Sequence, residues 1–393
     1  MVGMLEATSI HSKPQQPTGS APEVVRTFTD YPTIREKVAL GCETGRVVII
    51  FTDVDGTLVL GAGHHAPEIE QGQRDMKGLV KALNAQGAII IPITGSHFDS
   101  GTITTPSILH RIDRGVLPHV GVSAPDSSFA VDAYVSDGGA KSVHALSGQD
   151  VSYDSSYIAY VQPATLDYDQ LLSHAQSLAA VINQRNLTDE EQSLIAMYDT
   201  SRETSRVFLQ PGTASGSHRG SNKIAFYFYA SSLDERDQIE ASFAGHVKDF
   251  GMRVVCCEEK DATTAARRHP MLTELADNVR LPLKYCLDIA PFDKGMAVRH
   301  FSDYVLHLIV EQVLATGKER PALEVWACGD SGNDFSLMSS DIVTHAVIVG
   351  GASKELLRLG DRLKEHGKSV YIETDPSRLG PTSIAQAILG KEY

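Results

Sequence analysis

The feature that most constrains the fold of this chain is one continuous apolar run, RVVIIFTD, over residues 46–53. Its β-branched side chains favour an extended strand, and the absence of alternating polar residues indicates that both faces of the strand are covered. Strands of this kind belong to parallel sheets that carry helices on both sides. The run ends on acidic residues followed by Gly56, which is typical of a strand that opens into a loop.

Later runs have the same character. We predict further core strands over residues 88–94, 131–140, 322–330, 344–350 and 369–374. The spacing of apolar residues predicts helices over residues 31–45, 67–86, 294–315, 353–366 and 383–389. This alternation predicts an α/β fold with a doubly wound, Rossmann-like parallel sheet, in which ligands bind beyond the carboxyl ends of the strands.

The pattern changes between residues 151 and 285. Here the clearest strands are IAFYFYA (224–230) and RVVCCEE (253–259), and the helix predicted between them ends at Gly251. Strand, helix and strand in this order indicate an α+β cap domain inserted into the core. We therefore predict a flexible N-terminal tail (1–25), a first part of the core (26–150), the cap (151–285) and a second part of the core (286–393).

Charge and composition limit the partners. The net charge of -14 argues against nucleic acid or an anionic membrane as a partner. No apolar run is long enough to span a bilayer, and the N-terminus lacks the pattern of a secretory signal. The odd number of cysteines, 5, without a CxxC pair, suggests reduced thiols. We expect a cytoplasmic protein, and the sequence does not indicate its oligomeric state.

Polar residues gather where predicted strands end. Asp53 and Asp55 follow the first strand, and Thr94 and Gly95 follow the second. Asp330, Asn333 and Asp334 follow a third strand, and Lys294 begins the helix after the cap. Because the carboxyl ends of parallel strands meet at one edge of a sheet, we expect these segments to converge there.

Several carboxylates in one cleft cannot all stay ionised without compensating positive charge. A hard divalent cation such as Mg²⁺ accepts carboxylate and phosphate oxygens and provides that charge, and Lys294 would add to it. A carboxylate nucleophile, an acid/base group, a cation and hydrogen-bond donors are the parts that phosphoryl transfer needs. The pattern therefore predicts Mg²⁺ as the cofactor and a small phosphorylated molecule as the partner.

The segments resemble, in order, the four motifs of haloacid dehalogenase (HAD) superfamily phosphatases. FTDVDGTLV (51–59) resembles the first motif, PITGS contains the hydroxyl residue of the second, DKG contains the lysine of the third, and GDSGND (329–334) resembles the fourth. The resemblance implies a HAD core with an inserted cap.

The resemblance also implies a role for each matching residue. Asp53 would attack phosphorus and carry the phosphoryl group, while Asp55 would act as general acid and then as general base. Thr94 and the Gly95 amide would hold the phosphoryl group. Lys294 would stabilise charge, and Lys294 and Asn333 would also contact the phosphate. Asp53, the backbone carbonyl of Asp55, and Asp330 would bind Mg²⁺. Asn333 and Asp334 would orient the metal shell.

The cap is inserted at the same place as in the subclass of this superfamily with α+β caps (IIB). Within that subclass, the chain resembles the sucrose-phosphate phosphatases. ACGDSGND, HAVIVGGASKELL, LDIAP and KIAFYFY carry this likeness. It implies a sugar-phosphate substrate. Two interpretations of Lys223 in the cap stay open, a contact with the substrate or a plain charge at the edge of a strand. The chain departs from the pattern at three positions that bear on sugar selection, where Ser96 replaces an arginine and Asn222 and Ala225 replace a histidine and a serine.

Other interpretations remain open. Asp53 and Asp55 could form an ordinary acidic turn, and Lys294 could be a surface charge. A phosphosugar mutase of the phosphomannomutase type shares the DVDGTL start and the cap type. A mutase must hold a bisphosphate, however, and the cap offers few clustered cations besides Lys223 and Arg219. A non-catalytic sugar-phosphate-binding protein is the third alternative.

Overall fold

The structure is a computed structural model. It describes residues 28–60, 65–96, 98, 107–121, 127–147, 150–161, 167–201, 203–216, 223–259, 262, 265–266, 269–273, 281–375 and 378–390. The predicted N-terminal tail (1–25) lies outside the described residues, as does Asn222.

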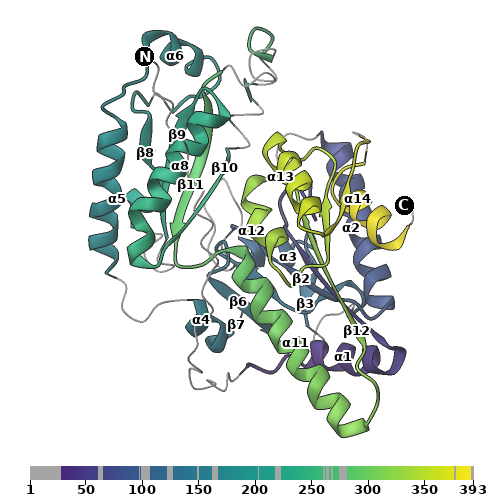
Figure 1. The fold of residues 1–393 in the computed structure, drawn as a ribbon. Coiled ribbons are helices and arrows are strands. Elements are labelled where there is room, and N and C mark those ends of the chain that lie inside the picture. The colour runs from purple at the N-terminus through teal and green to yellow at the C-terminus, as the bar shows by residue number, and fades with distance from the viewer. Residues whose placement is uncertain are drawn as a thin grey trace, which may run out of the picture.

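A five-stranded parallel sheet forms the centre of the core (Figure 1). Its order is β14 (Ser369–Ile372), β13 (His345–Ile348), β12 (Ala322–Gly329), β1 (Arg46–Thr52) and β2 (Ile89–Pro92). Every neighbouring pair in this sheet is parallel. The predicted α/β class, with a parallel core sheet and an inserted α+β region, is confirmed.

The two faces of the sheet explain why residues 47–51 of the first strand are all apolar. Val47, Ile49 and Phe51 are buried in one hydrophobic cluster, whereas Ile50 is buried in another. The first cluster includes side chains of α1 (Pro32–Thr44), α11 (Lys294–Thr316), α12 (Phe335–Ser339) and α13 (Lys354–Glu365). The second includes side chains of α2 (Ala66–Ala85), α3 (Ile108–Asp113) and α14 (Pro381–Leu389). Helices therefore cover both faces, as the strand composition requires.

The segment 131–140 differs from its prediction as one more strand of the core sheet. It forms β4 (Ala130–Val131) and β5 (Tyr134–Ser136), which belong to two smaller sheets. The interruption has a physical cause at Asp132, whose carboxylate accepts a hydrogen bond from the Ile90 amide at 2.7 Å. Asp132 also accepts from Lys37 at 2.8 Å, so this side chain partly replaces regular strand pairing beside β2.

The small sheets and short helices complete the core. They comprise β3 (His119–Val120), the 3₁₀ helix η1 (Ser127–Phe129), β6 (Lys141–Ser147), β7 (Asp150–Tyr153), α4 (Ser155–Val161) and the 3₁₀ helix η4 (Gly332–Asp334). Strand β3 pairs with β4, while β5, β6 and β7 form an antiparallel sheet.

The inserted region has an antiparallel sheet of its own. Its order is β10 (Arg253–Glu258), β11 (Leu283–Ala290), β9 (Ile224–Ala230) and β8 (Val207–Leu209). Helical elements of this region that the structure describes include α5 (Tyr168–Ile182), α6 (Asp189–Ile195), α7 (Pro211–Ala214), α8 (Leu233–Val247) and η3 (Lys248–Phe250). Buried residues of α5 and α8 share one hydrophobic cluster with Phe226, Leu287 and Ile289 of the sheet. The two helices therefore cover one face of this sheet.

The domain limits at 150/151 and 285/286 stay predictions. Tyr157 and Val161 are buried in a core cluster, whereas Tyr168 is buried in the cap cluster. Strand β11 pairs within the cap sheet up to Ala290. We propose that the chain enters the cap between Val161 and Tyr168 and leaves it at Ala290. Among the described residues, no helix combines the length and the apolar character that crossing a membrane would need.

Candidate active site

Strand pairing brings the first and last acidic segments together. Strands β1 and β12 are in register up to Thr52 and Cys328, and the Asp53 amide donates to the Cys328 carbonyl at 2.9 Å. Asp53 therefore lies beside the end of β12, where Asp330 follows. Asp53 is 5% exposed and Asp330 is 8% exposed. The ends of β1 and β12 therefore lie side by side in the structure, as the sequence analysis expects.

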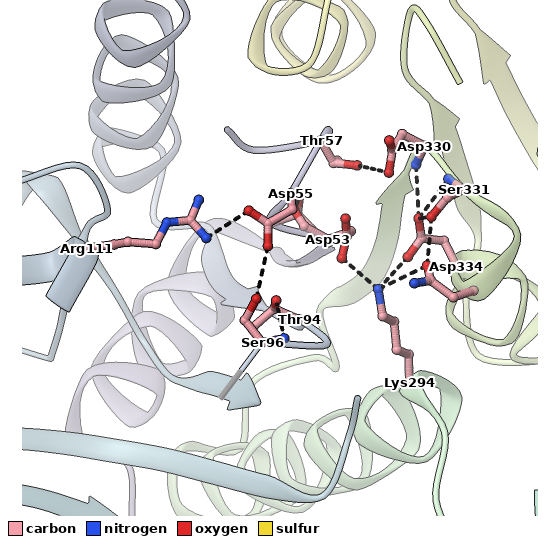
Figure 2. A network of polar contacts seen from close by, with 12 residues as sticks. Asp53, Asp55, Thr57, Thr94, Ser96, Arg111, Lys294, Asp330, Ser331 and Asp334 are labelled. Carbon is pink, nitrogen blue, oxygen red and sulfur yellow. Dashed lines mark hydrogen bonds and ion pairs between the residues drawn. The ribbon is translucent and has the colours of Figure 1, made fainter. Parts of the chain in front are cut away.

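Lys294 lies between two of the carboxylates (Figure 2). Its Nζ is 2.6 Å from Asp53 Oδ1 and 2.6 Å from Asp334 Oδ1. The same Nζ is 3.4 Å from Asn333 Oδ1. Lys294 is the first residue of α11, and the Asp293 side chain caps that helix by accepting from the Met296 amide at 2.9 Å. Asp293, as the N-cap of α11, and the start of the helix together direct Lys294 into the acidic cluster.

Burial alone would lower the pKa of Lys294, but the carboxylates of Asp334 and Asp53 more than offset that effect. The pKa of Lys294 is therefore raised above its ordinary value. Lys294 stays an ammonium at neutral pH, where it can pair with Asp53 or with a phosphoryl oxygen.

Asp334 is held firmly by the loop between β12 and η4. Its Oδ2 accepts from the backbone amides of Asp330 at 3.0 Å and Ser331 at 3.1 Å, while its Oδ1 accepts from Lys294. Because both oxygens of Asp334 are engaged, this side chain is better suited to shape the loop than to coordinate an ion. The resemblance to the fourth motif implies the same supporting role for Asp334, which stays a prediction.

The position of Asp334 requires a glycine at residue 329. A Cβ at Gly329 would lie 2.5 Å from Asp334 Cβ and 2.6 Å from its Oδ2. We expect Gly329→Ala to displace this carboxylate, to lower the free energy of unfolding by about 1–3 kcal/mol and to weaken Mg²⁺ binding. Urea unfolding and calorimetric Mg²⁺ titration would measure both effects. Gly245→Ala in α8 is the matched control, because a Cβ there meets nothing within 4 Å. Equal effects of the two variants would contradict this account.

The acidic cluster fits a hard divalent cation. Oxygen atoms of Asp53, Asp330 and Asp334 all lie within 4.8 Å of one another, and all three residues are buried. Lys294 compensates only part of this negative charge. Mg²⁺ binds carboxylate oxygens while keeping several waters, so Asp53 and Asp330 are the side chains that would hold it. Thr57 Oγ1 donates to Asp330 Oδ1 at 3.3 Å and helps to orient that carboxylate.

Asp55 has partners that the sequence analysis missed. Arg111 on α3 forms an ion pair with Asp55 Oδ1 at 2.8 Å, and Ser96 Oγ donates to Asp55 Oδ2 at 3.2 Å (Figure 2). Ser96 stands where the related motif has an arginine, and Arg111 brings a guanidinium to this part of the site from another element. A lone arginine in a short helix has no spacing signal, so only tertiary structure reveals its partner.

The second motif lies beside the first at the sheet edge. The Ile93 amide donates to the Thr52 carbonyl at 2.8 Å, which places Thr94 near the end of β1. The Thr94 hydroxyl oxygen accepts from the Ser96 amide at 3.0 Å. Thr94 is 1% exposed, so it is a buried residue beside the acidic cluster.

A cavity connects the core site with the cap. Its lining includes Gly95, Lys294 and Asn333 of the core together with Lys223 and Asp288 of the cap. Four residues singled out from the sequence therefore border one space: Gly95, Lys223, Lys294 and Asn333. Ala225 is buried in β9, opposite Asp288 in the strand register.

Comparisons with known proteins concern the fold. No protein-family model matches the chain, and no curated protein matches its sequence. A haloacid dehalogenase-like hydrolase from Bacillus subtilis is 16% identical, with 90% of this chain and 98% of that chain covered and a TM-score of 0.39. A HAD-superfamily phosphatase from Bacteroides thetaiotaomicron is 16% identical, with 88% and 96% covered and a TM-score of 0.45.

The C-terminal domain of trehalose-6-phosphate phosphatase from C. albicans is also similar. It is 9% identical, with 86% of this chain and 83% of that chain covered and a TM-score of 0.37. At identities and TM-scores this low, a likeness does not transfer an activity.

Proposed function

We propose that this protein is a Mg²⁺-dependent phosphatase of the HAD type, which hydrolyses a small sugar-phosphate monoester through a phosphorylated Asp53. The observation that carries the proposal is the buried cluster of Asp53, Asp330 and Asp334 around Lys294 at the carboxyl ends of β1 and β12. The four motifs in the sequence support the same reaction.

In the first step, an Asp53 carboxylate oxygen attacks phosphorus. An O–P bond forms to Asp53, the bond to the sugar oxygen breaks, and Asp55 gives that leaving oxygen a proton. Lys294 and the Gly95 amide stabilise negative charge on the phosphoryl oxygens, and Thr94 helps to hold the phosphoryl group. Preorganised donors of this kind commonly make the largest contribution to such reactions.

In the second step, water attacks the phosphorus of the aspartyl phosphate. Asp55, now a carboxylate, takes a proton from that water, the bond between Asp53 and phosphorus breaks, and inorganic phosphate leaves. Arg111 and Ser96 contact the Asp55 carboxylate, and we propose them as positioning residues for the form of Asp55 that acts as base. A bound Mg²⁺ would neutralise charge between the Asp53 and Asp330 carboxylates and the phosphoryl oxygens.

The cap supports a sugar phosphate over a bisphosphate. Lys223 is paired with Asp288 at 2.7 Å, so its charge is already compensated. The cap residues that the structure describes along this cavity therefore offer no uncompensated cation for a second phosphate. The phosphosugar mutase is the weaker alternative for this reason. Arg219, the other cation considered for that reaction, lies outside them.

Phosphate release tests the proposal. The wild-type protein should release inorganic phosphate from at least one ester among sucrose 6-phosphate, trehalose 6-phosphate, hexose phosphates and phosphoglycerate glycosides when Mg²⁺ is present. A chelator should abolish release and added Mg²⁺ should restore it. Release that a chelator leaves unchanged would refute the metal role. Isomer formation stimulated by a hexose bisphosphate, without net phosphate, would favour the mutase.

A further inference from the structure

The cap presents a charged pair to the cavity above the acidic cluster. Lys223 Nζ lies 2.7 Å from Asp288 Oδ2, and both residues line the cavity that Lys294 and Asn333 also line. The side chain of Lys223 is 16% exposed and that of Asp288 is 31% exposed, so the pair is partly shielded from solvent.

Strand geometry directs Asp288 toward the core. Leu287 and Ile289 are buried in the cap cluster beneath α5 and α8, and side chains alternate between the faces of a strand. Asp288 therefore lies on the face of β11 that those helices do not cover. Residue 288 is opposite Ala225, whose small side chain leaves room beside the carboxylate.

The cavity wall has no uncompensated cation among its described residues. Lys294 is shared between Asp53 and Asp334, and Lys223 is paired with Asp288. Burial alone would lower the pKa of Lys223, but neighbouring groups, with Asp288 first among them, more than offset this effect and the pKa is raised. The cap side of the cavity therefore combines one full positive charge with one carboxylate.

We propose that Asp288 is a specificity-determining residue that, with Lys223, selects a neutral, hydroxyl-bearing leaving group. A hydroxyl both donates and accepts, so it can donate to the Asp288 carboxylate and accept from the Lys223 ammonium. The second carboxylate oxygen of Asp288, Oδ1, is buried without a hydrogen-bond partner among the described residues, which leaves it free to accept. This inference rests on the proposed phosphatase function, and it attributes the preference for a class of substrate to Asp288.

The same pair disfavours a leaving group that carries a second phosphate. Such a group would bring two negative charges toward Asp288, and Lys223 could attract it only by giving up its present partner. Like charges brought together in a partly desolvated site raise the free energy of binding. The Asp288 carboxylate therefore acts as a filter against bisphosphates and other anionic esters.

Two substitutions test the proposal, because they change the charge of the pair in opposite directions. Asp288→Asn leaves Lys223 uncompensated, whereas Lys223→Gln leaves Asp288 uncompensated. The measured quantity is the ratio of kcat/KM for a hexose 6-phosphate to kcat/KM for the hexose 1,6-bisphosphate. We expect this ratio to fall by about 10-fold or more in Asp288→Asn and to rise by a similar factor in Lys223→Gln.

A reference substrate and a control variant distinguish a change in specificity from damage to the fold. Turnover of p-nitrophenyl phosphate, whose leaving group has no additional hydroxyl, should change by less than about 3-fold in Asp288→Asn. Asp199→Asn is the matched control, since it breaks the 2.9 Å pair with Lys284 of the same cap strand, and neither residue lines the cavity. The control should leave the substrate ratio unchanged, and the melting temperature shows whether each variant is folded.

The outcomes are distinct. Unchanged ratios, or ratios that move in the same direction in both charge variants, would overturn the role of Asp288 while leaving the phosphatase intact. Either variant alone decides the sign if the other does not fold. Failure of the wild-type protein to hydrolyse all three esters with Mg²⁺ would remove the proposed function, and this inference with it.

Discussion

Asp53→Asn should lower Mg²⁺-dependent phosphate release by about 10⁴-fold or more, because an amide oxygen cannot replace the carboxylate as nucleophile. Asn has nearly the shape of Asp, and Lys294 keeps its 2.6 Å contact with Asp334 as a remaining partner. The protein should therefore stay folded. Steady-state phosphate release with the wild-type substrate, combined with circular dichroism, would measure both expectations.

Asp132→Asn is the matched control for this loss. Asp132 is a buried aspartate that pairs with Lys37 at 2.8 Å, but it lies beside β2 and away from the acidic cluster. The control should reduce stability without a comparable loss of turnover. Substantial Mg²⁺-dependent release by Asp53→Asn would show that another group attacks phosphorus, and the assignment of the nucleophile would be wrong.

Lys294→Met should have the second-largest effect, on stability as well as activity. The variant leaves Asp53 and Asp334 without the ammonium that now lies 2.6 Å from each. Breaking a buried ion pair by removing one partner costs about 3–5 kcal/mol, and we expect a decrease of that size in the free energy of unfolding without metal. Turnover should fall by about 10²–10³-fold, the loss expected when one donor to the transition state is removed.

Mg²⁺ distinguishes the charge effect from a simple packing defect. A cation bound by the folded state alone stabilises that state, so added Mg²⁺ should recover part of the lost stability of Lys294→Met. Lys37→Met removes a lysine from the Asp132 pair and should lose stability that Mg²⁺ does not restore. Denaturant unfolding of both variants with Mg²⁺ and with a chelator would measure the difference. Equal responses to Mg²⁺ would argue against a cation at the acidic cluster.

Local pattern was sufficient to predict most of the core. The apolar run at 46–53 predicted a strand covered on both faces, and its side chains do alternate between two hydrophobic clusters. The spacing of apolar residues predicted a helix over residues 294–315, and α11 covers Lys294–Thr316, with Gly317 after it in the left-handed conformation at φ 66°. These features depend on residues close together in the chain, so the sequence contains their physical cause.

The segment 131–140 shows where local pattern is insufficient. Its apolar residues are typical of a strand, but the Asp132 carboxylate bonds to the Ile90 amide and Lys37. Both partners lie far away in the sequence, and no local preference encodes them. Positive φ angles at Asp137, Gly138 and Gly139 then end the extended backbone.

The sequence by itself determined which residue types stand at the ends of the core strands, because strand propensity and motif order are local properties. It thereby predicted an acidic cluster with a lysine. Only the tertiary structure decided that Arg111 pairs with Asp55 and that Asp288 pairs with Lys223 beside the cavity. Those pairs depend on how α3 and the cap lie against the core, and side chains far apart in the chain carry no spacing that reveals such contacts.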